Sequence, residues 1–252
     1  MRDIRETAMR PAQPGAMRLE TGCDQCGARA SNVCSTLAFK DLDRLARIAE
    51  PMIFAPGQSF IRESSPAEHF FNITSGTARL FKMLADGRQQ ITGFAGEGHF
   101  LGLAVPTAYA YGAEAVDTVR LCRYPRQRLM RLLAEFPAME RRMLEEVSNE
   151  LVAAQEQMLL LGRKNARERI ASFLVRRMAI TPLRHGVALP RIAMVRLPMA
   201  RRDIGDYLGM TIETVSRTLG TMKREGMIAI PDPARIVIQR PAALLALANG
   251  LA

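Results

Sequence analysis

Four cysteines carry the most distinctive chemistry in this chain of 252 residues. Cys23, Cys26 and Cys34 follow one another in a C-x2-C-x7-C pattern, and Cys122 lies much further along. Four thiolates can complete the coordination of a structural zinc ion or of a 4Fe-4S cluster, provided that the fold brings them together. The usual zinc signature is two close pairs, whereas here one close pair is followed by two single cysteines. The spacing alone leaves three interpretations open: a cluster, a zinc site, and cysteines that share no metal.

The start of the chain disfavours a fourth use of the cysteines, as disulfides. Residues 1–22 contain no apolar core of the kind that a secretory signal peptide requires. No apolar run in the sequence is long enough to span a bilayer. We therefore expect a cytoplasmic protein without a membrane segment, in which thiols stay reduced.

Positive charge is concentrated in the last third of the sequence. Residues 1–159 carry 19 Lys and Arg against 19 Asp and Glu, whereas residues 160–252 carry 16 against six, so the whole net charge of +10 lies in the C-terminal segment. A neutral body joined to a basic end indicates a polyanion partner, of which nucleic acid is the commonest. A solubilising basic surface is the alternative when no binding motif accompanies the charge.

Short β-rich runs, such as residues 70–73 and 78–83, occupy the region from about Phe54 to Tyr124. Turn residues separate these runs, at Pro56-Gly57, Ser75-Gly76, Asp86-Gly87 and Gly96-Glu97-Gly98. This pattern predicts a small antiparallel barrel or roll.

A long helix is predicted after Pro137, because glycine and proline are then absent until Gly162. Apolar residues recur along it at steps of four, four, three, four and three, namely Met143, Val147, Leu151, Ala154, Met158 and Leu161. A heptad-like stripe of this kind is typical of a helix that pairs with a second helix, and a homodimer follows if it does. The alternative is a helix that lies against its own domain.

The segment from Met199 to Glu225 has the pattern of a helix-turn-helix. A first helix is predicted to end at Gly209, and a second to run from Ile212 to Glu225 with Thr211 as its N-cap. Five apolar residues would fill the angle between the helices, namely Ile204, Leu208, Met210, Val215 and Leu219. Residues 227–238 then predict the β-hairpin of a winged version.

Glu213, Ser216 and Arg217 fall on one face of the second predicted helix. Arg can pair with guanine, Glu can accept from cytosine, and Ser can bond to either. The alternative is local: an acid in the first turn favours the helix dipole, and Glu213 with Arg217 can form an i,i+4 ion pair. The basic C-terminal third and the helix-turn-helix pattern favour base recognition.

From about Cys23 to Asn249 the sequence resembles the CRP/FNR transcription regulators and, within them, the oxygen-sensing FNR proteins. The most specific matching segments are QITGF at 90–94, LLLGRKNARER at 159–169, DIGDYLG at 203–209 and ETVSR at 213–217. The resemblance implies an α+β protein: an N-terminal antiparallel β-roll like that of cyclic-nucleotide-binding domains, a long dimerisation helix and a C-terminal winged helix-turn-helix. The implied segments are a cysteine segment (1–35), a sensor domain (36–136), the dimerisation helix (137–163) and a DNA-binding domain (164–252).

The resemblance also implies roles for individual residues. The family's oxygen-labile 4Fe-4S cluster would be bound by all four cysteines, Cys23, Cys26, Cys34 and Cys122. The residues that read each TTGAT-like half-site of a palindrome would be Glu213, Ser216 and Arg217. The seven-residue gap before Cys34 is longer than the five residues of the best-known FNR proteins and resembles that of other FNR-type members.

The cyclic-nucleotide branch of the family differs from this chain around the phosphate. That branch carries a Gly-Glu and an Arg-Ser/Thr pair, where this sequence has Gly102-Leu103 and about Tyr111-Gly112. An anionic phosphate would meet no cation there, so cyclic AMP is not expected as a ligand.

These expectations combine into an oxygen-responsive activator that binds double-stranded DNA as a homodimer and works with RNA polymerase. Cluster assembly would pack the cysteine segment onto the roll beside the long helix and so favour the dimer. Ala154 stands in the stripe where an acid would oppose pairing, which indicates an intrinsically favourable interface. The alternatives are a zinc-stabilised or ligand-sensing regulator of the same family and an iron-sulfur electron carrier. An enzyme is not expected, because the sequence shows no nucleophile motif, phosphate loop or paired-carboxylate signature.

Overall fold

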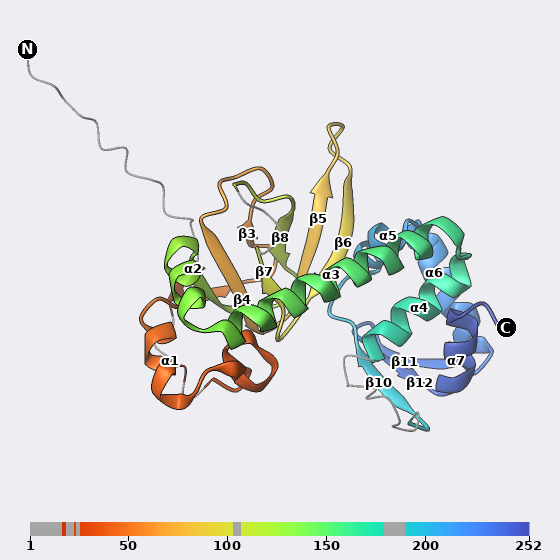
Figure 1. The fold of residues 1–252 in the computed structure, drawn as a ribbon. Coiled ribbons are helices and arrows are strands. Elements are labelled where there is room, and N and C mark those ends of the chain that lie inside the picture. Colours follow the sequence, from red (N-terminus) through yellow and green to blue (C-terminus); the bar gives the residue numbers. More distant parts are fainter. Residues whose placement is uncertain (1–16, 19–22, 24–25, 103–106, 179–189, 252) are drawn as a thin grey trace, which may run out of the picture.

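The computed structural model describes residues 17–18, 23, 26–102, 107–178 and 190–251. Most of the predicted cysteine segment before Cys26, and Leu103, therefore lie outside the described residues. A β-roll is followed by the long helix α3 (Pro137–Arg163), which runs lengthwise to a small C-terminal domain (Figure 1). No described helix combines the length and the apolar composition that crossing a membrane requires.

Two antiparallel sheets form the roll, as the sequence predicts. The first has the order β1-β2-β9-β4-β7, with β1 (Met17–Arg18), β2 (Glu50–Phe54), β4 (His69–Ser75), β7 (Phe100–Leu101) and β9 (Val119–Pro125). The second has the order β3-β8-β5-β6, with β3 (Ser59–Ile61), β5 (Ala78–Met83), β6 (Gln89–Ala95) and β8 (Gly112–Ala115). The predicted turns are confirmed, since a glycine with positive φ stands in each of them, at Gly57, Gly76, Gly87 and Gly98.

The first sheet is buried on both faces, and successive residues of its strands alternate between them. Phe71, Ile73 and Leu121 belong to the core between the two sheets. Phe70 and Tyr124 belong to a second core on the outer face. This second core is covered by the 3-10 turn η3 (Val33–Thr36), which follows the turn η2 (Arg29–Ser31), by α1 (Phe39–Ala46) and α2 (Arg126–Glu135), and by the start of α3. The alternation therefore turns Cys122 toward the N-terminal segment, while its neighbour Leu121 faces the roll interior.

The C-terminal domain is a winged helix-turn-helix. Its elements are α4 (Ala166–Met178), β10 (Ala193–Arg196), α5 (Arg201–Leu208), α6 (Ile212–Arg224), β11 (Ile228–Asp232), β12 (Arg235–Ile238) and α7 (Pro241–Ala248), and its antiparallel sheet has the order β10-β12-β11. The turn is built as predicted: Gly209 has φ +60°, and the Thr211 hydroxyl accepts the Thr214 N–H at 3.2 Å. A Cβ on Gly205 would lie 2.6 Å from the Met210 carbonyl oxygen, so only glycine allows this approach.

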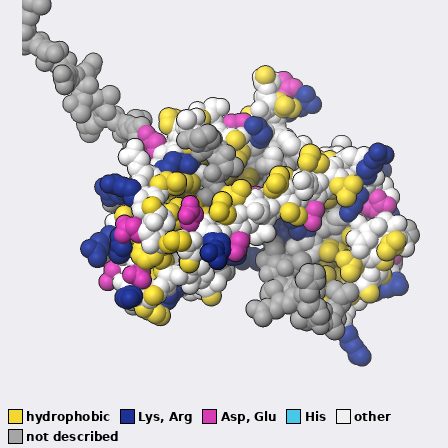
Figure 2. All heavy atoms as spheres, in the orientation of Figure 1, with side chains coloured by type: hydrophobic (Ala, Val, Ile, Leu, Met, Phe, Trp, Pro, Cys, Tyr) yellow, Lys and Arg dark blue, Asp and Glu magenta, His cyan; other side chains and the backbone are white. Residues whose placement is uncertain are grey.

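One side of α3 packs on the roll and the other carries uncovered apolar side chains. Met139 and Met143 are buried in the outer core of the roll. Along the exposed side, Leu144, Leu151 and Met158 leave 62%, 61% and 66% of their surface accessible. Figure 2 shows hydrophobic side chains in a band over this helix.

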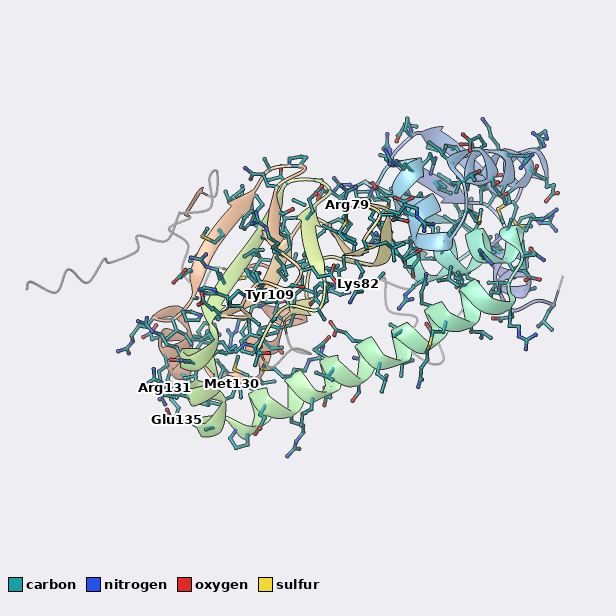
Figure 3. All side chains as sticks on the ribbon, turned by 90° about the horizontal axis from the view of Figure 1, so that it is seen from above. Arg79, Lys82, Tyr109, Met130, Arg131 and Glu135 are labelled. Atoms are coloured by element: carbon teal, nitrogen blue, oxygen red, sulfur yellow. The ribbon has the colours of Figure 1, made fainter. Side chains whose placement is uncertain are left out.

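The second sheet docks against the C-terminal domain through the segment QITGF. Gln90 donates its side-chain N–H to the Asp206 carbonyl oxygen, and the Phe94 ring lies 5.5 Å from that of Tyr207. Arg79 of β5 bonds the buried Asp203 of α5 at 2.5 Å, on the side of the roll that faces this domain (Figure 3). No local sequence pattern predicts this contact between the two domains.

Candidate functional site

The four cysteines line one cavity of about 850 Å³ on the outer face of the first sheet. Cys34 is buried in η3, and Cys23, Cys26 and Cys122 are half-buried. None of the four forms a disulfide. The turns η2 and η3 fold the N-terminal segment back over strands β4 and β9, so that thiols from distant parts of the sequence meet in this cavity.

Burial and charge repulsion raise the pKa of two of these thiols, Cys34 and Cys122. Burial raises the pKa of Cys122 to about 12, and nearby Cys23 adds to the rise through charge repulsion. Burial likewise raises the pKa of Cys34 to about 11, with further contributions from Cys26 and Cys23. The repulsion means that the sulfurs lie within electrostatic reach of one another. A bound cation would reverse this balance, because metal binding requires and stabilises thiolates.

The cavity also presents polar groups that the sequence analysis missed. Asn72 and Asn32 line it, and each is only 1% exposed. The Asn72 Oδ1 atom and both amide atoms of Asn32 have no hydrogen-bond partner. The buried hydroxyl of Tyr124 bonds the Cys122 sulfur, and burial raises the pKa of this tyrosine well above its usual value. No sequence motif marks these residues, because only the strand register and the fold of the η turns bring them to the cysteines.

The cavity carries the thiol donors that a metal centre requires. Among the described residues, no three His, Cys, Asp or Glu side chains stand close enough together to hold one metal ion. A zinc ion would need its sulfurs at about 2.3 Å, and therefore close to one another. A 4Fe-4S cluster accepts four thiolates spread around a larger core. The donor set, the volume and the unpartnered amides therefore fit such a cluster.

The cysteine cavity lies directly behind the dimerisation helix predicted from the sequence. η3, which holds Cys34, packs against α3. Met143 lies in the same buried core as Cys34, so it is not available to a second helix. We therefore replace Met143 by its exposed neighbour Leu144 in the proposed seam, which becomes Leu144, Val147, Leu151, Ala154, Met158 and Leu161. The steps are then three, four, three, four and three, a regular heptad pattern.

The predicted base-reading residues share one exposed face of α6. Glu213, Ser216 and Arg217 are all exposed, whereas Val215 and Leu219 on the opposite face are buried. The ion pairs of the described residues do not include one between Glu213 and Arg217. The lowered pKa of Glu213 comes from hydrogen bonds with its own backbone and with Thr211. The local ion-pair alternative is therefore absent, and Arg217 points to solvent.

A second cavity of about 480 Å³ lies between the roll, α3 and the C-terminal domain. Glu150 of α3 lines it, and burial, with repulsion from Glu146, raises the pKa of Glu150 to about 7. Gly102, at the position of the family's phosphate contacts, donates its N–H to the Tyr111 hydroxyl at 3.1 Å. The Tyr111 hydroxyl therefore satisfies the Gly102 backbone N–H at this edge of the roll.

The fold and the exposed α6 face define a winged helix-turn-helix DNA-binding protein with an N-terminal β-roll domain. A Crp-like helix-turn-helix domain matches residues 168–247, and a cyclic nucleotide-binding domain matches residues 51–136. The transcriptional activatory protein AadR of Rhodopseudomonas palustris is 39% identical over 213 residues, which are 84% of this chain and 87% of that protein. The nitrogen fixation regulation protein FixK of Bradyrhizobium diazoefficiens is 38% identical, over 85% of this chain and 92% of that protein.

A solved structure agrees with these relatives. The structure of FixK2 from Bradyrhizobium japonicum matches with a TM-score of 0.71 and 34% identity, over 79% of this chain and 97% of that one. The chain belongs to the CRP/FNR family of DNA-binding transcription regulators.

Proposed function

We propose that this regulator senses oxygen through a 4Fe-4S cluster held by Cys23, Cys26, Cys34 and Cys122, and that it binds TTGAT-like palindromes as a homodimer. The observation that carries the proposal is the single cavity that all four cysteines line, from two segments far apart in the sequence. The exposed face of α6, with Glu213, Ser216 and Arg217, supports sequence-specific recognition in the major groove.

Whether the cysteine segment is tied to the first sheet or released from it affects the dimer through η3, because η3 packs against α3. When bound, a 4Fe-4S cluster supplies oxygen-labile iron–thiolate bonds that tie this segment to the first sheet. Cys34 holds η3 against the start of α3, and Met139 and Met143 fill the core between them. With the segment tied down, the exposed side of α3 keeps a fixed position for pairing with a second copy. Release of the segment exposes this core, which weakens the support of α3 and hence the dimer.

The proposal is tested on protein purified under argon. We expect a brown protein with about four irons per chain that loses its colour in air. Cys122→Ser should remove the iron as fully as Cys34→Ser, because each supplies one of the four ligands. Ser75→Ala is the matched control, since it alters the same cavity without removing a thiol and should keep the iron.

Two results would overturn the proposal. A colourless protein with one zinc per chain would show a structural zinc site instead. A Cys122→Ser variant with unchanged iron content would show that the distant cysteine is not a ligand, although it lines the cavity.

A further inference from the structure

Asn72 stands directly beside the proposed ligand Cys122. The two residues are opposite each other in the antiparallel pair of β4 and β9. Directly opposed side chains share one face of a sheet, with Cβ atoms about 4.5–5.5 Å apart. Asn72 is 1% exposed, lines the cysteine cavity, and leaves its Oδ1 atom without a partner.

Asn32 approaches the same cavity from the N-terminal segment. It is the N-cap residue of η3, and asparagine in that position usually accepts a hydrogen bond from the following turn. Here the side chain makes no capping bond, and its Nδ2 and Oδ1 atoms have no partner although the residue is 1% exposed. Its local hydrogen bonds are those of its backbone: the carbonyl accepts the Ser35 N–H at 2.9 Å, and the N–H donates to the Arg29 carbonyl oxygen at 3.2 Å.

Three buried amide atoms without partners at one cavity, both of Asn32 and the oxygen of Asn72, are an unfavourable arrangement unless a ligand satisfies them, since a buried polar group without a hydrogen bond destabilises the folded state. A carboxamide has two N–H donors, and rotation by 180° exchanges its oxygen and nitrogen. Thiolate and sulfide sulfurs accept hydrogen bonds, and such bonds tune the reduction potential of iron-sulfur centres. The amides therefore match the chemistry of a cluster better than that of an empty apolar site.

We propose that Asn32 and Asn72 donate hydrogen bonds to sulfur atoms of the cluster in the cysteine cavity and thereby favour its more reduced state. The inference rests on the proposed function, because it requires that a cluster binds. Donors near the sulfurs stabilise the form with the greater negative charge. Their removal lowers the reduction potential, so that the centre becomes easier to oxidise.

The test replaces each amide by an apolar side chain, as Asn32→Leu and Asn72→Leu, and measures loaded and metal-free protein separately. In the loaded protein, we expect a lower midpoint potential and a several-fold shorter half-life of the visible absorption in air. A tenfold loss of preference for the reduced form corresponds to about 59 mV for a one-electron couple. In the metal-free protein, we expect a higher Tm, because an unsatisfied amide has been removed.

The two expected changes have opposite directions: the cluster becomes easier to oxidise in the loaded protein, and the Tm rises in the metal-free protein. This difference distinguishes hydrogen bonding to the cluster from simple packing. Thr74→Val is the matched control, because Thr74 lies on the same face of β4 as Asn72 and lines the same cavity while remaining half-exposed. Variants that lower the Tm with and without metal would assign the amides to packing and overturn the inference. So would an equal shift in Thr74→Val, or an unchanged potential in both Leu variants. A wild-type protein that binds no iron would instead refute the proposed function itself.

Discussion

Replacing Leu151 by glutamate tests whether the exposed stripe of α3 forms the dimer seam. Leu151 lies in the middle of the stripe and is 61% exposed in the single chain. At an a or d position of paired helices, the two copies of this residue would face each other across the interface. The glutamate variant would remove two apolar contacts and place two carboxylates opposite each other.

The expected loss of dimerisation free energy follows from the exposed fraction of the Leu151 side chain. Full burial of a leucine side chain contributes about 1.5–3 kcal/mol, so covering the exposed part contributes about 1–2 kcal/mol per chain and about 2–4 kcal/mol per dimer. This loss corresponds to a rise of about 30- to 700-fold in the dimer dissociation constant. Repulsion between the carboxylates adds to it.

The assay is sedimentation equilibrium under argon on protein that has kept its bound metal, together with DNA binding by the same sample. Val152→Glu is the matched control: Val152 is 54% exposed on the same helix, but at 100° per residue it lies well to the side of the seam. We expect Leu151→Glu to be monomeric at micromolar concentration and Val152→Glu to remain dimeric, with the metal-centre spectrum unchanged in both. If Leu151→Glu sediments as a dimer, the stripe does not form the interface and the reasoning is wrong.

Three further predictions concern the DNA-binding domain and the second cavity. Arg217→Ala should weaken the binding free energy by about 1–3 kcal/mol on a matched half-site, and by much less on a site whose guanine is replaced. Both sites are titrated at one salt concentration. An equal loss on the two sites would show that Arg217 does not recognise the base. Gly205→Ala should destabilise the protein by about 1–3 kcal/mol in urea unfolding, because its Cβ would lie 2.6 Å from a backbone oxygen; unchanged stability would show that the turn adjusts freely. Glu150 has a pKa raised from 4.5 to about 7, so the folded state binds the extra proton and stability falls as the pH rises through this window. Glu150→Gln should remove this part of the pH dependence and give a higher Tm than wild type at pH 8 but not at pH 4; parallel Tm curves for the two proteins would contradict it.

The local elements of this fold could be predicted from sequence because short-range rules govern them. Glycine turns separate the strands of the roll, Pro137 and the absence of glycine delimit α3, and Thr211 caps α6. The sequence patterns do not predict the helices α1, α2, α4 and α7 or the strand β10. The apolar residues of these elements indicate a helix or a strand only once the surface that they cover is known.

Contacts between distant segments could not be predicted in the same way. Met143 and Leu144 are adjacent apolar residues that fit a helical stripe about equally well. Only the packing of the cysteine segment on α3 decides that Met143 is buried and Leu144 exposed. Likewise, nothing in the local sequence shows that Arg79 joins the buried Asp203 across the domain boundary.

For the candidate site, the chemistry can be read from the amino-acid sequence: four thiols, a basic C-terminal third and a helix face with Glu213, Ser216 and Arg217. Residue types and helical periodicity are properties of the sequence and do not depend on the tertiary structure. The tertiary structure alone decided what surrounds the thiols. The register of β4 on β9 sets Asn72 opposite Cys122, and the η turns bring Asn32 into the same cavity. That register depends on pairing between segments far apart in the chain, which satisfies backbone hydrogen bonds and buries both faces of the sheet together.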